Sequence, residues 1–131
     1  MLTNLLLVGL IQGFSPPAPP PAGCDPFLIF FDVESSRVPA RYHQMIDTIA
    51  SLKEQVRSHM TVDGFADATG STAYNLELSR SRAKSVEAAL IARGVPKRLI
   101  VVGAHGESRP MEGTRYMSAE AESRRVSVCF Y

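Results

Sequence analysis

The sequence predicts an α+β fold, a two-layer sandwich in which a mixed four-stranded sheet is covered by two main helices. Three observations indicate this fold: short apolar runs of strand length, two longer segments with helical periodicity, and the alternation of these along the chain. The order is β-α-β-α-β followed by a final strand. A length of 131 residues is typical of one domain.

The first strand is predicted at residues 27–31, a continuous apolar run that Asp32 ends. Helix-start signals at residues 35–39 precede a helix, with Pro39 in its first turn. Apolar residues then recur at three- and four-residue steps and define a buried face. These residues are Tyr42, Met45, Ile46, Ile49, Leu52 and Val56.

The second half of the chain repeats this pattern. Residues 59–64 alternate as a strand with one buried face, and a second helix is predicted over residues 72–93, with Gly94 and Pro96 as its stop signals. Its inward residues are Leu78, Val86, Ala89 and Leu90. Strands are then predicted at residues 99–102 and, after a Gly-rich segment, at residues 124–131.

The charge balance argues against a nucleic-acid partner. The chain has 14 Lys plus Arg and 13 Asp plus Glu, a formal net charge of +1. Binding to a phosphate backbone needs a basic excess gathered on one face. The hydrophobic fraction of 45% and the charged fraction of 21% are those of a globular domain rather than a disordered one.

The first 23 residues contain no Asp, Glu, Lys or Arg and form a separate segment. Residues 5–11 are apolar but far shorter than the ~20 residues that span a bilayer, which is typical of a secretion signal. We expect a signal segment at residues 1–15, although its start lacks the usual positive charge. The alternative is a buried N-terminal helix. Residues 16–23 are rich in proline and predict an extended spacer, so the domain occupies residues 24–131.

Residues 64–70 and 75–86 resemble the signature of the OmpA-like C-terminal domain family, which also includes MotB and Pal. The second segment matches the family pattern N-x-x-L-S-x-x-R-A-x-x-V at every fixed position. Further pieces fall in the family's order over residues 24–131. They are residues 30–32, 94–96, 103–107, Pro110 and residues 124–126.

The resemblance implies a non-catalytic module, without cofactor, that binds peptidoglycan through the diaminopimelate residue of its stem peptide. It implies a place in the periplasm or outer membrane of a Gram-negative-type envelope, where the module anchors the envelope to the cell wall. An N-terminal membrane tether and a homodimer are compatible with this role. The alternative is a protein–protein assembly subunit of an envelope complex that uses the same fold.

By the same resemblance, Asp67 takes the ligand's ammonium group and Arg82 takes its carboxylate. The residue types suit these roles, because a planar guanidinium holds a carboxylate with two parallel hydrogen bonds. A helix N-terminus beside them adds positive charge. The alternative is a structural ion pair between Asp67 and Arg82 that caps the second helix.

Three further residues are candidate ligand contacts, each with a structural alternative. Asn75 contacts ligand or serves as the N-cap of the second helix. Thr69 contacts ligand or supplies a turn hydroxyl. Arg125 matches the second arginine of the family's terminal N-R-R-V motif and reaches the ligand carboxylate, or it is solvated.

Several positions depart from the family pattern, and two of them bear on the candidate site. Ala66 removes a hydroxyl that commonly precedes the aspartate, and Ser123 stands where an asparagine precedes the paired arginines. Both departures leave the charged residues in place.

Cys24 and Cys129 are the two cysteines, and Cys24 has two mutually exclusive uses. Its position after Ala22 and Gly23 resembles the end of a lipoprotein box. In an oxidising periplasm it instead forms a disulfide with Cys129. An antiparallel pairing of the first and last strands brings these two residues opposite each other.

No catalytic or metal-binding pattern competes with the binding role. The three histidines, His43, His59 and His105, have no metal-ligand spacing. We expect His105 to serve packing and Glu107 to brace a loop or to be solvated. An enzyme that acts on the wall is the least supported class.

Overall fold

The computed structural model describes residues 24–113 and 117–131. The predicted signal segment at residues 1–15 and the spacer at residues 16–23 lie outside the described residues. In residues 24–113 and 117–131, every helix is too short or too polar to span a lipid bilayer.

Four strands form one sheet in the order β1-β4-β2-β3. They are β1 (Phe27–Phe30), β2 (Met60–Gly64), β3 (Ile100–Ala104) and β4 (Arg125–Phe130). β4 lies between β1 and β2 and is antiparallel to both, whereas β2 and β3 are parallel. The predicted mixed sheet is therefore confirmed, and the last strand occupies an interior position.

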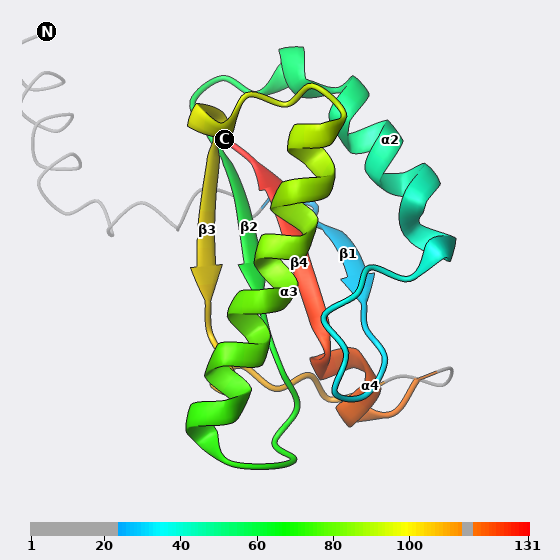
Figure 1. The fold of residues 1–131 in the computed structure, drawn as a ribbon, viewed down its shortest axis with the longest axis vertical. Coiled ribbons are helices and arrows are strands. Elements are labelled where there is room, and N and C mark those ends of the chain that lie inside the picture. Colours follow the sequence, from blue (N-terminus) through cyan, green and yellow to red (C-terminus); the bar gives the residue numbers. More distant parts are fainter. Residues whose placement is uncertain (1–23, 114–116) are drawn as a thin grey trace, which may run out of the picture.

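Two main helices, α2 (His43–Ser51) and α3 (Thr72–Ala92), lie on one face of the sheet (Figure 1). α2 is shorter than predicted at both ends. Pro39 precedes a separate 3-10 turn, η1 (Ala40–Tyr42), and Val56 follows another, η2 (Lys53–Gln55). Proline is tolerated before a first turn because its missing N–H has no partner there.

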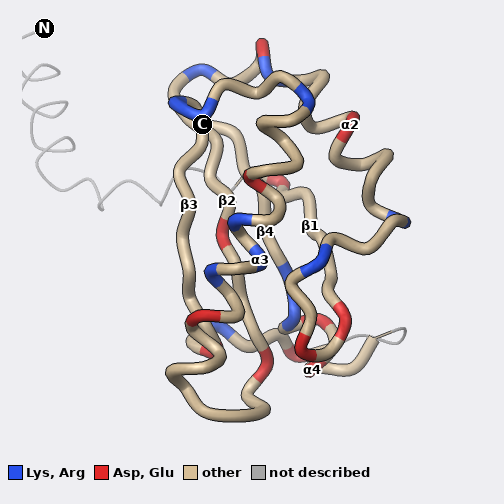
Figure 2. The backbone as a smooth tube through the Cα atoms, viewed as in Figure 1, with Lys and Arg blue, Asp and Glu red and all other residues tan. Residues whose placement is uncertain are grey.

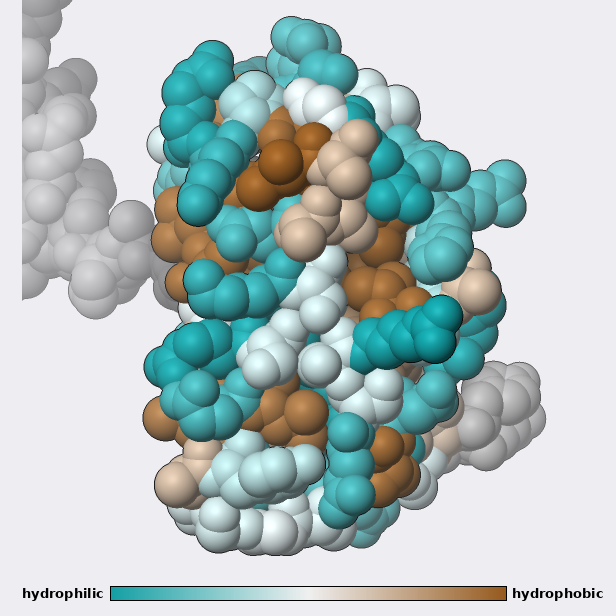
Figure 3. Space-filling view, viewed as in Figure 1, coloured by the Kyte–Doolittle hydropathy of each residue, from teal (hydrophilic) through white to brown (hydrophobic). Residues whose placement is uncertain are grey.

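The hydrophobic core fills the space between the sheet and the two helices. Its strand members alternate along each strand, so one face of the sheet is buried. They include Ile29, Met60, Val62, Ile100, Val126 and Val128, which pack with Ile46, Ile49, Val86 and Leu90 of the helices. Figure 3 shows mainly hydrophilic residues over α2 and a mixture of hydrophilic, neutral and apolar residues over α3, with apolar residues visible between the two helices.

Two predicted inward residues of α3, Leu78 and Ala89, are only half-buried, and polar residues take the most buried positions in the first half of this helix. Asn75, Ser79 and Arg82 are all at most 1% exposed. The helix is apolar toward the core only in its second half. Its first half packs against the chain segments that form the site.

Cys24 and Cys129 form a disulfide with their Cα atoms 5.7 Å apart. The antiparallel register pairs Phe27 with Val128, so the segment before β1 meets the end of β4 as the sequence predicts. A cysteine in a disulfide has no thiol to carry a lipid, so the two uses of Cys24 exclude each other.

The connection from β3 to β4 contains a short helix, α4 (Ala119–Ser123), which the sequence analysis did not predict. Ser118 caps it by accepting a hydrogen bond from the amide of Ala121, and Ser123 holds it by accepting one from the amide of Met111. Figure 1 places α4 at the lower end of the sheet, below β1 and β4. β3 is an edge strand and β4 an interior one, so this connection has to cross beneath β2.

Candidate functional site

The segment after β2 is fixed by main-chain hydrogen bonds on both sides. The amide of Phe65 donates to the carbonyl of Arg125 (2.8 Å), and the amide of Ala66 donates to the carbonyl of Gly106 (2.8 Å). These bonds extend the pairing of β2 with its neighbours beyond Gly64. The next residue, Asp67, is therefore held in place and is only 7% exposed.

α3 approaches β2 closely at Gly64. A β-carbon at this position would overlap the carbonyl oxygen of Ser79, so only glycine fits. Ser79 also accepts a hydrogen bond from the amide of Gly106 through its hydroxyl (2.9 Å). This close approach sets the distance between the first half of α3 and the loop that carries Asp67.

The carboxylate of Asp67 has three hydrogen-bond donors. Its Oδ1 accepts from the amide of Thr69 (2.9 Å) and from the Thr69 hydroxyl, and its Oδ2 accepts from Nη1 of Arg124 (3.1 Å). Burial by itself raises the pKa of Asp67, but these hydrogen bonds outweigh it, so the pKa lies below the ordinary value of 3.8. Asp67 is therefore a carboxylate at neutral pH.

α3 begins after Gly70, which has a φ of +86°. Ser71 is the N-cap, since its hydroxyl accepts from the amide of Tyr74. The alternative that Asn75 caps this helix is therefore wrong, because Asn75 lies one turn inside it and donates to Glu107 (3.3 Å). Glu107 also accepts from Thr72 (2.6 Å), so it braces the segment after β3 against α3, one of the two roles expected for it.

Arg82 is completely buried, with 0% exposure. Its Nε donates to the carbonyl of Ser35 (2.8 Å), its Nη2 to that of Asp32 (3.1 Å) and its Nη1 to that of Phe65 (3.2 Å). A guanidinium has five N–H groups, so two remain for other acceptors. Burial lowers the pKa of Arg82 to about 10, although Asp67 acts in the opposite direction. Arg82 is therefore a buried cation at neutral pH.

Arg124 is the residue that the sequence analysis missed. Its Nη1 pairs with Asp67, and its Nε donates to the carbonyl of Phe31 (3.0 Å). The expected alternative of an Asp67–Arg82 ion pair is therefore wrong, because Arg124 takes that place. The only signal in the sequence was its position next to Arg125 in the family motif.

Arg125 lies away from Asp67, because successive residues at a strand start point to opposite sides. Its guanidinium carbon lies 3.9 Å from the centre of the Phe65 ring, and its Nη2 donates to the carbonyl of Arg109 (3.1 Å). His105 stacks on the same ring with the centroids 4.8 Å apart, which is the packing role expected for it. Burial lowers the pKa of Arg125, with Arg109 acting in the same direction.

These groups surround a small pocket of about 60 Å³, which we call the Asp67 pocket. It lies between the β2–α3 loop, the first turns of α3 and the β1–α2 connection. Its lining residues are Glu34, Asp67, Thr69, Gly70, Tyr74, Asn75, Leu78, Arg82 and Arg124. Four of the five predicted ligand-binding residues line it, and Arg125 does not.

The charge of the Asp67 pocket is mixed. Glu34 and Asp67 supply two carboxylates, and Arg82 and Arg124 supply two guanidiniums. Figure 2 shows acidic and basic positions close together where the β1–α2 connection, α4 and the lower part of α3 meet. Among the described residues, no group of three or more His, Cys, Asp or Glu residues is placed to hold a metal ion. A pocket with this lining suits a small group that carries both charges.

The model of the OmpA family matches residues 30–124 of the chain. The chain belongs to the OmpA family. Its OmpA-like domain is 34% identical over 99 residues to the peptidoglycan-associated lipoprotein of Brucella melitensis, covering 75% of this chain and 59% of that protein. It is 30% identical over 130 residues to the peptidoglycan-binding protein ArfA of Mycobacterium tuberculosis, covering 90% of this chain and 40% of ArfA. The chain thus spans about half the length of these relatives.

Solved structures agree with the OmpA-like fold. The peptidoglycan-associated lipoprotein of Burkholderia pseudomallei superposes with a TM-score of 0.71 at 26% identity, over 79% of this chain and 89% of that one. The C-terminal domain of Helicobacter pylori MotB superposes with a TM-score of 0.70 at 27% identity, over 83% and 85% of the two chains. The family resemblance drawn from the motifs is confirmed.

Proposed function

We propose that this OmpA-like domain binds peptidoglycan without cutting it and anchors the envelope to the cell wall. The ligand group is the free amino-acid centre of diaminopimelate in the stem peptide. The observation that carries the proposal is the Asp67 pocket, where a carboxylate and two guanidiniums meet in a space of about 60 Å³. The relatives whose names refer to peptidoglycan support it, and with it a location in the periplasm or at the outer membrane.

Asp67 is the acceptor for the ligand's ammonium group. A carboxylate has about four lone-pair sites, and three donors already bind this one, so one site is open. Thr69 fixes the carboxylate with its amide and its hydroxyl. This hydroxyl takes the place of the one that the family pattern has next to the aspartate and that Ala66 lacks. An ammonium group in the Asp67 pocket is then bound by a charge-assisted hydrogen bond.

Arg82 and Arg124 together bind the ligand's carboxylate. Arg124 is partly exposed, with 16% of its side chain accessible, and meets the ligand directly. Arg82 stands behind it with two uncommitted N–H groups and a charge that burial leaves unscreened. Asn75 lines the same wall and orients the ligand with its amide.

The sharpest test is co-sedimentation of the full chain with purified sacculi. We compare wild type with Asp67→Asn and Arg124→Gln, and use Asp47→Asn as the matched control. Asp47 also pairs with an arginine, Arg93, but on the exposed surface of α2. Removing one partner of a desolvated charge pair typically costs about 2–5 kcal/mol of binding free energy. Equal recovery of all four folded proteins contradicts the assigned site.

The same sacculi test the non-catalytic part of the proposal. We expect the turbidity of a sacculus suspension to stay constant while the protein binds. A fall in turbidity over time, with release of soluble fragments, would establish hydrolysis and contradict this part.

A second candidate function is assembly with another protein, and one observation favours it. The sheet face opposite α2 and α3 carries Leu28, Thr61, Asp63, Val101 and Ser127, and Val101 is 51% exposed. The two main helices, α2 and α3, lie on the other face of the sheet (Figure 1). If the domain self-associates through it, analytical ultracentrifugation detects a homodimer that Val101→Glu disrupts. A monomer at all concentrations contradicts the homodimer.

A further inference from the structure

Glu34 has an unusual backbone conformation. It is the only non-glycine residue with a positive φ among residues 24–113 and 117–131, at +54°. Residues with a β-carbon seldom adopt this left-handed region, and those that do cluster at sites of function. Glu34 lies in the turn between β1 and η1, and it lines the Asp67 pocket.

The turn is held by hydrogen bonds from Arg82 to its main chain, and not by burial of its own side chains. The Arg82 guanidinium binds the carbonyls of Asp32 and Ser35, which flank the turn on both sides. The amide of Ser35 closes the turn onto the carbonyl of Asp32 (3.2 Å). Val33 is 62% exposed, so its apolar side chain does not anchor the turn.

The two carboxylates of the Asp67 pocket differ in burial and in hydrogen bonding. Asp67 is buried and accepts three hydrogen bonds. Glu34 is exposed, and among the described residues its carboxylate has no hydrogen bond or ion pair. An ammonium group has three N–H donors, whereas Asp67 has one open site. The ammonium N–H groups that Asp67 does not bind need another acceptor in the pocket.

We propose that Glu34 is this second acceptor and that it selects ligands with a free ammonium group. The inference rests on the proposed function and adds to it a specificity-determining residue. With Glu34, the two carboxylates balance Arg82 and Arg124, so the pocket matches a ligand centre whose own charges cancel. Without Glu34, the pocket has an excess of one positive charge and favours a lone carboxylate.

The test uses two synthetic tripeptides, L-Ala-γ-D-Glu-meso-diaminopimelate and the same peptide acetylated on its free side-chain amine. Affinities of the full chain for both are measured by titration calorimetry. The variants are Glu34→Gln, which removes the charge, and Glu34→Gly, which removes the charge and also suits the positive φ. Glu54→Gln is the matched control, because Glu54 is an exposed glutamate in η2 that does not line the pocket.

We expect both Glu34 variants to bind the free-amine peptide about tenfold more weakly than wild type, the scale of one charge-assisted hydrogen bond. Acetylation should then cost them less affinity than it costs wild type, while Glu54→Gln behaves as wild type. A loss in only one Glu34 variant, or an equal effect of acetylation on wild type and both variants, overturns the role of the charge.

The outcomes separate this inference from the proposed function. If wild type binds and Asp67→Asn does not, while Glu34→Gln binds as wild type, Glu34 has no role but the site stands. If wild type binds neither peptide, both the proposed function and the role of Glu34 are overturned.

Discussion

Asp67 and Arg124 form an ion pair, with 3.1 Å between Oδ2 and Nη1, although 57 positions separate them in the sequence. Arg124 also holds the carbonyl of Phe31 at the end of β1. The pair therefore joins the loop after β2 to the residue before β4 and, through Phe31, to the end of β1. The adjacent Arg125 makes none of these contacts.

The two adjacent arginines are expected to differ in function. Arg124→Gln should weaken binding to sacculi by about 2–5 kcal/mol, because it removes a guanidinium from the Asp67 pocket. Arg125→Gln should leave binding of the folded protein unchanged, since this residue packs on Phe65. Co-sedimentation with sacculi measures both effects, and a larger loss for Arg125→Gln would contradict this assignment.

Removal of Arg82 should destabilise the fold. Arg82→Ala leaves three carbonyls without their donor and opens a cavity at a fully buried position. We expect a loss of about 3–5 kcal/mol in the free energy of unfolding.

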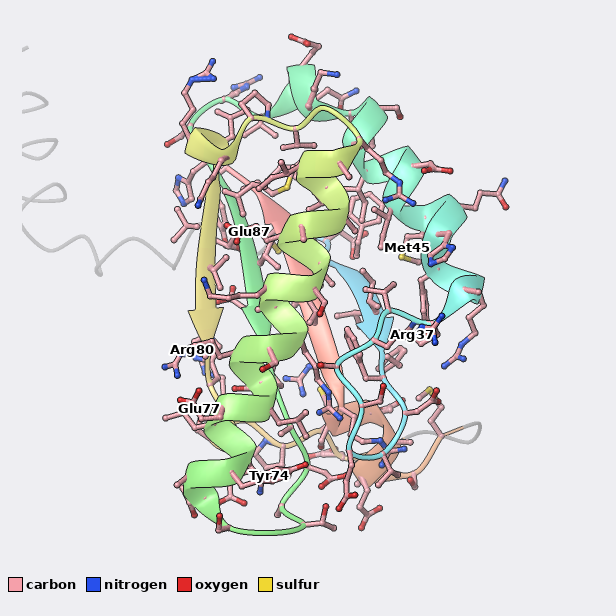
Figure 4. All side chains as sticks on the ribbon, viewed as in Figure 1. Arg37, Met45, Tyr74, Glu77, Arg80 and Glu87 are labelled. Carbon is pink, nitrogen blue, oxygen red and sulfur yellow. A yellow bond between two sulfur atoms is a disulfide. The ribbon has the colours of Figure 1, made fainter. Side chains whose placement is uncertain are left out.

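Arg80→Ala is the matched control, because Arg80 pairs with Glu77 on the exposed side of α3 (Figure 4). Its effect should stay within about 0.5 kcal/mol. Urea unfolding followed by circular dichroism measures both values. Similar midpoints for the two variants would show that the three carbonyls do not depend on Arg82.

Stability should fall in acid through Asp67. Its pKa is lowered in the folded protein, so it stabilises the fold at pH values above its ordinary pKa of 3.8. This contribution is lost as the pH drops through the lower, folded-state pKa. Asp67→Asn should therefore be less stable than wild type near neutrality, and the difference should shrink in acid.

Urea unfolding at a series of pH values from about 6 down to about 2 measures this dependence. Asp47→Asn is again the control, because solvent screens the exposed Asp47–Arg93 pair. A constant difference between wild type and Asp67→Asn at all pH values would contradict the role of Asp67.

Gly64→Ala should be strongly destabilising, because its β-carbon would overlap the main chain of α3 at Ser79. Overpacking of this kind costs about 1–3 kcal/mol and sometimes more. Gly103→Ala provides the comparison, since its β-carbon meets the side chains of Asp63 and His105 and not the main chain. These half-buried side chains can shift, at the cost of the hydrogen bond between them. Thermal unfolding should give a lower midpoint temperature for Gly64→Ala than for Gly103→Ala. The reverse order would be inconsistent with this packing.

Loss of the disulfide should lower stability without changing the fold. Cys24 and Cys129 close a loop with a sequence separation of 105. A disulfide typically contributes about 2–4 kcal/mol, and the chain-entropy model gives ~4.7 kcal/mol for a loop of about this length. The double variant Cys24→Ser, Cys129→Ser should unfold at lower urea than the oxidised wild type. The reduced wild type should match the variant, and an intact mass with a lipid would contradict the disulfide.

The number, order and type of the main helices and strands follow from the local sequence. Strand and helix periodicities are local properties, so the strands predicted at residues 27–31 and 59–64 are found within one residue of those bounds. The stop signal at Gly94 follows the end of α3 at Ala92 by two residues. The signature motif also placed Asp67 and Arg82, because its residues lie in one continuous loop and helix.

The pairing of the charged groups, in contrast, depends on how the strands and helices are arranged in space. Arg124 reaches Asp67 because β4 lies between β1 and β2, and no local pattern encodes that strand order. Arg82 is buried because its acceptors come from the β1–α2 connection and from the segment after β2. Such contacts join segments far apart in the chain, so their energies depend on the complete fold and not on the spacing of residues along it.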